Sequence, residues 1–250
     1  MCKSKNRKPI SDEQQIMTRW NEFYKDMLNR ENPNTSTWND TLVGAENRID
    51  SVTISEVSTA IKKLKNNKSS GEDNIVSELL KYGGPELHRE IHKLITNIWN
   101  QEEIPAEWLS SVIIPIHKKG DKTICGNYRG ISLLSTTYKV FSNVLYERIY
   151  PYYEEIVEDY QGGFRKEKSV TDQCFIFGQI FEKFHEFSLN IHCLFIDFKQ
   201  AFDSIDRQTI KFILLKQGIP NKLVSLIMIP LNGTISKVRI HGQFTDSFNV

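Results

Sequence analysis

The chain has 250 residues, 39% of them hydrophobic and 25% charged, and its formal net charge at pH 7 is +1. This composition is ordinary for a soluble globular protein, and the length allows one large domain or two small ones with a full hydrophobic core. The charge balance excludes a uniformly basic surface, so any nucleic-acid-binding surface must come from local clusters of Lys and Arg.

Cysteine and histidine spacings do not match the common metal and redox motifs. No two of the four cysteines, Cys2, Cys125, Cys174 and Cys193, have the spacing of a zinc or redox site, and we expect free thiols in a reducing compartment. The six histidines have no metal-binding spacing. The N-terminus has basic residues without an apolar segment behind them, and no stretch approaches the length that spans a bilayer. We therefore expect an intracellular protein of the nucleus or cytoplasm, with no membrane partner and no secretion.

Residues 1–9 form a basic run that indicates a mobile lead-in. Such a run is more often a solvated tail than a phosphate-binding site. Ser11 and Gln14 form a capping-box pattern that opens an amphipathic helix. The apolar side of that helix, which should pack against the body of the protein, consists of Ile16, Trp20, Phe23, Tyr24 and Met27. Residues 31–51 have the composition of a linker, so we expect residues 1–50 to be a helix and linker that precede the main domain.

The next segment predicts three helices around a polar loop. Thr53 and Glu56 form a second capping box at the start of a short helix. The loop at 64–75, Leu-Lys-Asn-Asn-Lys-Ser-Ser-Gly-Glu-Asp-Asn-Ile, leads into a helix that breaks at a Gly-Gly-Pro sequence. Pro85 is suited to the first turn of a further, structural helix that ends before Pro105.

Residues 111–134 indicate a β-hairpin. A short β-rich run leads into a Lys-Lys-Gly-Asp turn, and a second extended piece carries Arg129. Two antiparallel strands could bring Lys118 or Lys119 close to Arg129, and two cations on one surface are suited to a triphosphate. Considered alone, the pattern is more simply explained as a solvated hairpin tip.

A glycine-containing loop at 161–169 joins two predicted helices. The first helix, over 135–150, has an inward apolar stripe. In the loop, Gly163 and Phe164 precede Arg165, so backbone amides and a guanidinium could approach a phosphate chain closely. A basic surface loop ahead of a helix would explain the same residues. A serine caps the second helix, whose inward face should carry Phe177, Ile180, Phe181 and Phe184.

Residues 191–207 carry the most informative chemistry. The apolar run Cys193–Ile196 predicts a strand buried on both faces, and it ends on Asp197. Burying an unpaired carboxylate is costly, so Asp197 must lie in water at the sheet's edge, pair with a base or hold a metal. Asp206 is placed to cap the next helix. Considered alone, Asp197 could equally be an ordinary turn or cap residue, and Phe202 is more often a core residue in such a position.

The last elements are a helix over 221–229 and a hairpin with strands at 234–240 and 244–250 around a His-Gly turn. Pro230 is unusual near a helix end and is expected to kink the helix.

The segment Phe-Ile-Asp-Phe-Lys-Gln-Ala-Phe-Asp-Ser-Ile-Asp at 195–206 resembles the first catalytic block of the reverse transcriptases of non-LTR (LINE-type) retrotransposons. The hairpin at 111–134 and the loop at 161–169 resemble two earlier blocks, in the family's order, across roughly residues 50–250. The resemblance implies an α+β fold, the fingers and partial palm of a right-hand polymerase, mostly helical with a small antiparallel sheet. Residues 51–250 would then be a partial reverse transcriptase domain.

The same resemblance implies roles for individual residues. Asp197 would bind two catalytic Mg²⁺ ions, helped by the backbone carbonyl of Phe198. Phe202 would lie under the incoming sugar, where a ribose 2′-hydroxyl would clash with it. The triphosphate of the nucleotide would be carried by Lys118, Lys119 and Arg129. Contact with template or primer would fall to Gly163, Phe164 and Arg165.

The implied reaction is RNA-directed DNA synthesis, a nucleotidyl transfer. A primer 3′-hydroxyl attacks the α-phosphorus of a deoxynucleoside triphosphate, and two metals roughly 3.5–4 Å apart stabilise the attacking and leaving oxygens. The implied partners are an RNA template, a DNA primer and deoxynucleoside triphosphates.

The chain also departs from the family pattern. Gly130 replaces a proline, and the loop at 64–75 lacks two prolines and a glycine, so both should be less rigid. Residues 166–168 replace Pro-Gly-Arg and keep the positive charge. The family's later Gly-Val-Arg-Gln-Gly block, its aromatic-Ala-Asp-Asp turn with the remaining metal carboxylates, and its thumb do not occur in the sequence.

A single carboxylate is poorly suited to holding two divalent ions in catalytic geometry. We therefore expect a truncated domain that binds Mg²⁺ poorly and is inactive by itself. The alternative is a remnant that serves as a nucleic-acid-binding or protein-interaction module without catalysis. The sequence leaves open whether this chain is an enzyme, its template and its oligomeric state.

Overall fold

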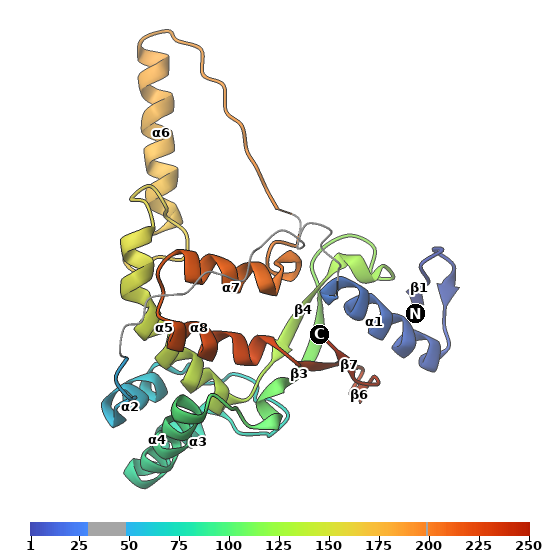
Figure 1. Ribbon diagram of the computed structural model, residues 1–250. Coiled ribbons are helices and arrows are strands. Elements are labelled where there is room, and N and C mark those ends of the chain that lie inside the picture. Colours follow the sequence, from blue (N-terminus) through green and yellow to red (C-terminus); the bar gives the residue numbers. More distant parts are fainter. Residues whose placement is uncertain (30–48, 199) are drawn as a thin grey trace. The chain divides into compact units, whose positions relative to one another are not determined.

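The computed structural model describes residues 1–29, 49–198 and 200–250, and most of the expected linker at 31–51 lies outside them. The chain divides into two compact units, one made of Met1–Ile149 with Phe202–Val250 and the other of Tyr150–Ala201. In Figure 1 the smaller unit is the part of the chain coloured from yellow to orange.

The larger unit contains most of the helices. They are α1 (Glu13–Leu28), α2 (Ile54–Lys63), α3 (Ser77–Tyr82), α4 (Gly84–Gln101), the first two thirds of α5 (Thr136–Ile156), α7 (Arg207–Lys216) and α8 (Asn221–Met228). Short 3₁₀ turns lie at Ala106–Leu109, Cys125–Asn127, Phe202–Ser204 and Ile229–Leu231. In the described residues, no helix is both long enough and apolar enough to cross a membrane.

The sheet of this unit is mixed. Its strands are β3 (Ser110–His117), β4 (Tyr128–Leu133), β5 (Ile235–Ile240), β6 (Gln243–Phe244) and β7 (Phe248–Asn249). Strands β3 and β4 form the antiparallel hairpin that the sequence predicts, and β6 and β7 also pair antiparallel with β5. Strand β5 runs parallel to β3, so the expectation of an antiparallel sheet is correct only in part.

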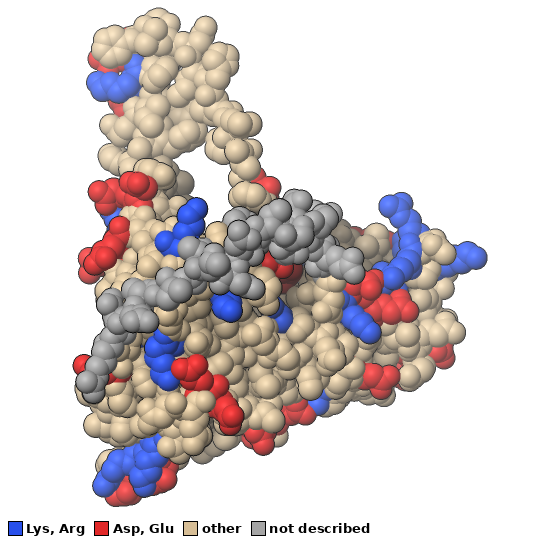
Figure 2. All heavy atoms as spheres, in the orientation of Figure 1, with Lys and Arg blue, Asp and Glu red and all other residues tan. Residues whose placement is uncertain are grey.

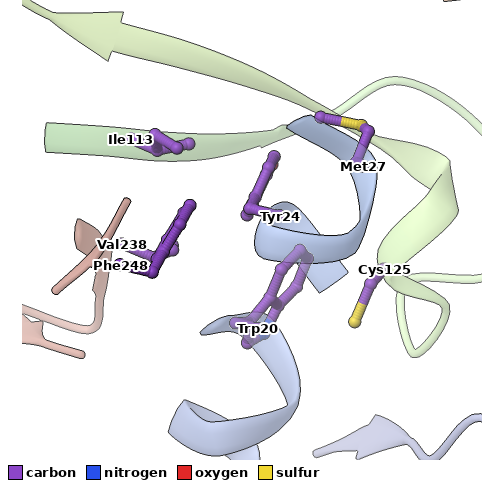
Figure 3. Close-up of a cluster of buried hydrophobic side chains, with 7 residues drawn as sticks. All are labelled: Trp20, Tyr24, Met27, Ile113, Cys125, Val238 and Phe248. Atoms are coloured by element: carbon purple, nitrogen blue, oxygen red, sulfur yellow. The ribbon is translucent and has the colours of Figure 1, made fainter. Parts of the chain in front are cut away.

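Helix α1 covers one face of this sheet. Seven buried side chains form one hydrophobic cluster between the helix and the sheet (Figure 3): Trp20, Tyr24 and Met27 of α1, Ile113 of β3, Cys125 of the turn between β3 and β4, Val238 of β5 and Phe248 of β7. The helix predicted near the N-terminus is therefore part of the core of the larger unit.

In the larger unit, the predicted capping residues Thr53 and Asp206 are confirmed. The Thr53 hydroxyl accepts the Glu56 N–H and the Glu56 carboxylate accepts the Thr53 N–H, which is a complete capping box for α2. Asp206 caps α7 by accepting the Thr209 N–H at 2.7 Å. The start of α1 was placed one residue too early, because its N-cap is Asp12 rather than Ser11.

The expectation of a mobile basic lead-in is wrong. Cys2–Lys3 and Pro9–Ile10 form the antiparallel strands β1 and β2, and the Cys2 side chain is buried. The segment is rich in Lys and Arg, so its composition suggested a solvated tail, and composition alone does not show that the Cys2 side chain anchors it.

The smaller unit is built on α6 (Val170–Glu186), whose predicted Ser169 cap is confirmed. None of the residues of α6 is buried, so the expectation that its apolar face turns into a core is wrong. The expected strand at Cys193–Ile196 is also wrong: these residues form no strand, and Leu194 is 85% exposed. Hydrophobicity predicts burial, but a strand also needs a neighbouring backbone with which to form hydrogen bonds, and the described residues of this unit form no strand.

Candidate functional site

The β3–β4 hairpin places two cations on one face. Ile116 lies opposite Arg129 in the antiparallel register. Beyond the strand ends, the Lys118 N–H donates to the Asn127 carbonyl at 2.9 Å, so the ladder continues. Because alternate residues of a strand share a face, Lys118 lies on the face of Ile116 and Arg129, whereas Lys119 begins the turn.

The three hairpin cations are available to an anion. Lys118, Lys119 and Arg129 are exposed. Within the described part of the chain, none of their side chains has an ion pair or a hydrogen bond. An incoming phosphate would therefore not have to displace an internal partner, and an Arg can bind phosphate oxygens with two parallel hydrogen bonds.

Asp121 organises the turn that follows the two lysines. Its carboxylate accepts the Thr123 N–H at 2.8 Å and the Thr123 hydroxyl at 2.7 Å. The Lys3 ammonium donates to it at 2.7 Å. The hydrogen bonds from Lys3 and Thr123 hold the pKa of Asp121 below its usual range. Gly120 has φ +79°, a conformation that few other residues adopt, so the turn needs glycine at this position.

A groove of about 650 Å³ opens on the face of the sheet that carries Ile114, Ile116 and Ile131. Arg129 is two residues before Ile131 on β4, so it lies on the groove side of the hairpin. The residues that line the groove are Lys63, Leu64, Lys65, Lys68, Ser69, Ser77, Ile114, Ile116, Ile131, Ser132, Leu133, Lys139, Asn143 and Arg239.

The groove is cationic. Among the described residues, five of its lining side chains are Lys or Arg and none is acidic. Lys63 is paired with Glu147 at 2.7 Å, whereas Lys68, Lys139 and Arg239 have no ion pair within the described part. Figure 2 shows acidic and basic side chains interspersed over the face drawn. The lining of the groove differs from this mixture and is a local cluster of positive charge. The sequence required such a cluster for any nucleic-acid-binding surface.

The loop at 64–75, which borders the groove, packs against the residue before α5 and pairs with β5. A Cβ on Gly71 would lie 2.7 Å from the backbone N of Ser135, so only glycine lets the two backbones approach this closely. Glu72 forms an ion pair with Lys237 of β5. The hydrogen bond that the Lys237 ammonium donates to Glu72 is the largest of the causes that lower the pKa of Glu72.

Arg165 of the smaller unit is engaged within the protein. Its guanidinium forms an ion pair with Glu154 at 2.9 Å and donates to the Glu158 carbonyl at 2.9 Å. Its side chain is 7% exposed. Phe164, with φ +62°, is 82% exposed, and Gly163 lies beside it. Contact of these three residues with nucleic acid stays a prediction.

The predicted catalytic residues are exposed. Asp197 and Phe198 belong to the smaller unit, and Phe202 begins the second segment of the larger unit. Phe198 and Phe202 are each 76% exposed. The expected meeting of Asp197 with the hairpin cations stays a prediction, as does the position of Phe202 under a sugar.

The donor set does not by itself fit a two-metal site. Carboxylate oxygens such as those of Asp197 are suitable Mg²⁺ ligands. However, residues 1–29, 49–198 and 200–250 contain no group of three or more His, Cys, Asp or Glu side chains placed to hold a metal ion. One exposed carboxylate is too few for two divalent ions.

Sequence reasoning missed the groove. Its cations come from α2, the loop at 64–75, α5 and β5. Arg239 reaches it because β5 pairs in parallel with β3, a crossover between segments far apart in the chain. The only available signal was the local density of lysines around Lys63, Lys65 and Lys68, which also fits a solvated helix end.

Residues 116–248 match the family model described as reverse transcriptase (RNA-dependent DNA polymerase). An uncharacterised 149 kDa protein of transposon TX1 from Xenopus laevis is 26% identical over 208 residues, which are 80% of this chain and 16% of that protein.

Two Drosophila melanogaster proteins are also similar. The probable RNA-directed DNA polymerase from transposon X-element is 29% identical over 202 residues, 78% of this chain and 22% of that protein. The one from transposon BS is 30% identical over 188 residues, 74% of this chain and 20% of that protein. The chain thus spans about a fifth of the length of these curated relatives, and the resemblance to the enzymes of non-LTR retrotransposons is confirmed.

Proposed function

This chain belongs to the reverse transcriptase (RNA-dependent DNA polymerase) family of non-LTR transposons, and we propose that it binds the nucleotide and the nucleic acid for RNA-directed DNA synthesis. The family match of residues 116–248 carries the proposal. It begins at the hairpin residue that faces Arg129 and continues through the region of Asp197.

The hairpin β3–β4 is assigned to the fingers of a right-hand polymerase, and the segment from Asp197 onward to the first part of the palm. The exposed Lys118 and Arg129 on one face of the hairpin support this assignment. A triphosphate carries several negative charges, and these two cations offer a point charge and a two-pronged donor. In this proposal the nucleotide is a deoxynucleoside triphosphate, with Phe202 under its sugar.

The cationic groove is assigned to the sugar-phosphate backbone of the RNA template or the DNA primer. Lys68, Lys139 and Arg239 would bind phosphates, and the release of condensed counterions would supply the affinity. The floor of isoleucines would contact sugars and bases without reading sequence. Gly163, Phe164 and Arg165 would add a second contact from the smaller unit.

Asp197 would bind Mg²⁺ with the Phe198 carbonyl, and Mg²⁺ would supply electrophilic stabilisation of the reacting phosphate. Because the described residues offer no group of metal ligands, the proposal includes no primer extension by this chain alone. Asp197 would hold its ligand only when other carboxylates join it.

The test is nucleic-acid binding by the purified 250-residue chain. A labelled RNA template annealed to a DNA primer should bind to the chain on a filter, and its affinity should fall steeply between 50 and 200 mM salt. Primer extension with Mg²⁺ and four deoxynucleoside triphosphates should yield no product. Weak binding that ignores salt would overturn the assignment of the groove, and clear extension would overturn the proposed lack of catalysis.

A second candidate is a module that binds nucleic acid without any role in polymerisation, and the unpaired cations of the groove favour it equally. Triphosphate binding separates the two. A polymerase-derived site should bind inorganic triphosphate through Lys118 and Arg129, whereas a plain backbone-binding module should lose no triphosphate affinity when these two side chains are neutralised.

A further inference from the structure

Strand β1 is attached to the turn of the β3–β4 hairpin. The Lys3 N–H donates to the Thr123 carbonyl at 2.8 Å, and the Lys3 ammonium lies 2.7 Å from the Asp121 carboxylate. Cys2, next in the strand, is buried, and so is Cys125 at the base of the turn. One backbone hydrogen bond, one ion pair and two buried Cys side chains therefore hold β1 against the β3–β4 turn, which is more than a hundred residues away in the sequence.

Asp121 connects this attachment to the lysines. Its backbone carbonyl accepts the Asn127 side-chain N–H at 2.9 Å, and the His117 ring nitrogen lies 3.0 Å from the Gly120 carbonyl. The Tyr128 hydroxyl donates to the Lys122 carbonyl at 2.8 Å. These bonds span the turn from both strands, and the Asp121 carboxylate is the point at which β1 meets them.

We propose that strand β1, acting through the Lys3–Asp121 ion pair, is a positioning element of the triphosphate site. The inference rests on the proposed function of Lys118 and Arg129. Lys3 does not touch the triphosphate; its ammonium is committed to Asp121. It acts by holding the turn after Lys118 in one conformation.

The physical reason is conformational entropy. Residues 118–124 have no helix or strand of their own, so a free turn would sample many conformations and would lose that freedom when it closes on an anion. A turn that is already fixed binds with a smaller loss. The attachment to β1 therefore raises triphosphate affinity without adding a contact to the ligand.

The sign of one substitution separates positioning from simple electrostatics. Asp121→Asn removes a negative charge close to the lysines, so Coulomb attraction alone would strengthen the binding of an anion. Positioning predicts the opposite, because the turn loses its ion pair with Lys3. Thr123→Val removes one hydrogen bond to the same carboxylate without changing the charge, and it should weaken binding in the same direction.

Lys5 offers a matched control for Lys3. It belongs to the same N-terminal segment, but its ammonium pairs with Asp26 of α1 at 2.7 Å and not with the turn. Lys3→Met and Lys5→Met remove the same charge and keep a similar apolar stem. Lys3→Arg keeps the charge and the ion pair.

The experiment measures binding of inorganic triphosphate by calorimetry and hydrogen exchange of the amides of residues 118–128, in the full 250-residue chain. Lys3→Met and Asp121→Asn should weaken triphosphate binding by about threefold to tenfold and speed amide exchange in the turn. Lys3→Arg and Lys5→Met should do neither. Exchange in β3 and β5 should stay unchanged in every variant, which shows that the sheet is folded.

The outcomes distinguish two failures. If Lys118→Gln with Arg129→Gln leaves triphosphate binding intact, the proposed site itself is wrong. If that pair abolishes binding while Lys3→Met and Asp121→Asn leave it unchanged, or Asp121→Asn strengthens it, only the positioning role is wrong. Equal losses in Lys3→Met and Lys5→Met would also reject positioning, because they would show a general effect of charge.

Discussion

The ring of Tyr24 occupies the space that a side chain on Gly130 would need. A Cβ built on Gly130 would lie 2.7 Å from Cε1 of Tyr24 and 3.1 Å from Cγ2 of Ile113. The family pattern that the hairpin resembles has a proline where this chain has Gly130, and the glycine lets the Tyr24 ring of α1 pack directly on β4. From the sequence, Gly130 in place of proline was expected to loosen the hairpin. In the structure, the same glycine makes room for the large side chain of Tyr24 in the core.

We therefore predict that Gly130→Ala destabilises the protein by about 1–3 kcal/mol, the usual range for overpacking a core. Chemical denaturation followed by circular dichroism measures this change. Gly126→Ala is the control, because nothing lies within 4 Å of a Cβ there, and it should cost little. In a Tyr24→Leu background the cost of Gly130→Ala should fall; an equal cost in both backgrounds would show that the ring is not the obstacle.

The second prediction concerns pH. Burial raises the pKa of Glu56, but hydrogen bonds from Arg148 and Thr53 and the charge of Arg148 outweigh it and lower the pKa to about 2. Glu56 belongs to α2 and Arg148 to α5, so their ion pair joins the two helices, and Arg148 also donates to the carbonyl of Ser51 at 3.1 Å. A carboxyl group whose pKa is lower in the folded state than in the unfolded state stabilises the fold at pH values above its unfolded-state pKa. This contribution is lost as the pH falls through the folded-state pKa.

Glu56→Gln should therefore lower the free energy of unfolding by about 1–3 kcal/mol at pH 7, since it leaves Arg148 partly unpaired. Thermal melts between pH 7 and pH 2 should show the difference from the unmodified chain shrinking below about pH 4.5. Glu90→Gln, which breaks the exposed pair with Lys93, should change little at any pH. A difference that stays constant down to pH 2 would contradict the assigned pKa.

The third prediction concerns the groove. Lys139→Gln should weaken binding of a primer–template duplex and reduce the slope of log affinity against log salt by about 0.7–0.9, the value for one lost phosphate contact. Lys93→Gln changes the net charge equally but lies on α4 in a pair with Glu90, away from the groove lining. Filter binding at several salt concentrations measures both. Equal slopes for the two variants would remove Lys139 from the interface.

The fourth prediction separates the two hairpin lysines. Lys118 shares a face with Arg129, and Lys119 does not. Lys118→Gln should therefore weaken triphosphate binding about tenfold, close to the loss of a charge-assisted hydrogen bond, and Lys119→Gln much less. Calorimetric titration with inorganic triphosphate measures the difference. A larger loss at Lys119 would mean that the anion binds over the turn and not over the groove face.

Predictability from the sequence followed the distance between partners. The Thr53–Glu56 box and the Asp206 cap join residues three apart, and each was read correctly because a helix start is a local event. The β3–β4 hairpin was also found, since its two strands follow each other directly in the sequence and are joined by residues 118–127. Each of these signals lies within one continuous segment of the chain.

Features that need a distant partner were missed. The sequence of β3 does not indicate that β5 pairs with it in parallel. This pairing places Arg239 of β5 in the lining of the groove. The apolar run at Cys193–Ile196 predicts burial but does not indicate which segment would pack against it, and the described residues of its unit form no strand with which it could pair. Lys3 looked like one charge of a solvated tail until its partner, Asp121, was known.

The last prediction concerns Arg165, which was expected to contact nucleic acid but pairs with Glu154. The Glu154 carboxylate holds the guanidinium as a phosphate would, and the hydrogen bond from Arg165, the largest cause, lowers the pKa of Glu154. If Arg165 also binds phosphate, then Glu154 competes with nucleic acid for it. Glu154→Gln should then tighten duplex binding, because it weakens the competing bond while the Glu158 carbonyl still accepts from Arg165.

Glu155→Gln provides the control, since it removes the same charge from the neighbouring, exposed residue. Glu154→Gln should strengthen filter binding several-fold more than Glu155→Gln, and the excess should vanish when Arg165→Ala is added, because no guanidinium remains to be released. Equal gains from the two glutamines would show only a general loss of negative charge. Arg165 would then be a residue that fixes its own loop, and the contact with template or primer would have to come from the groove alone.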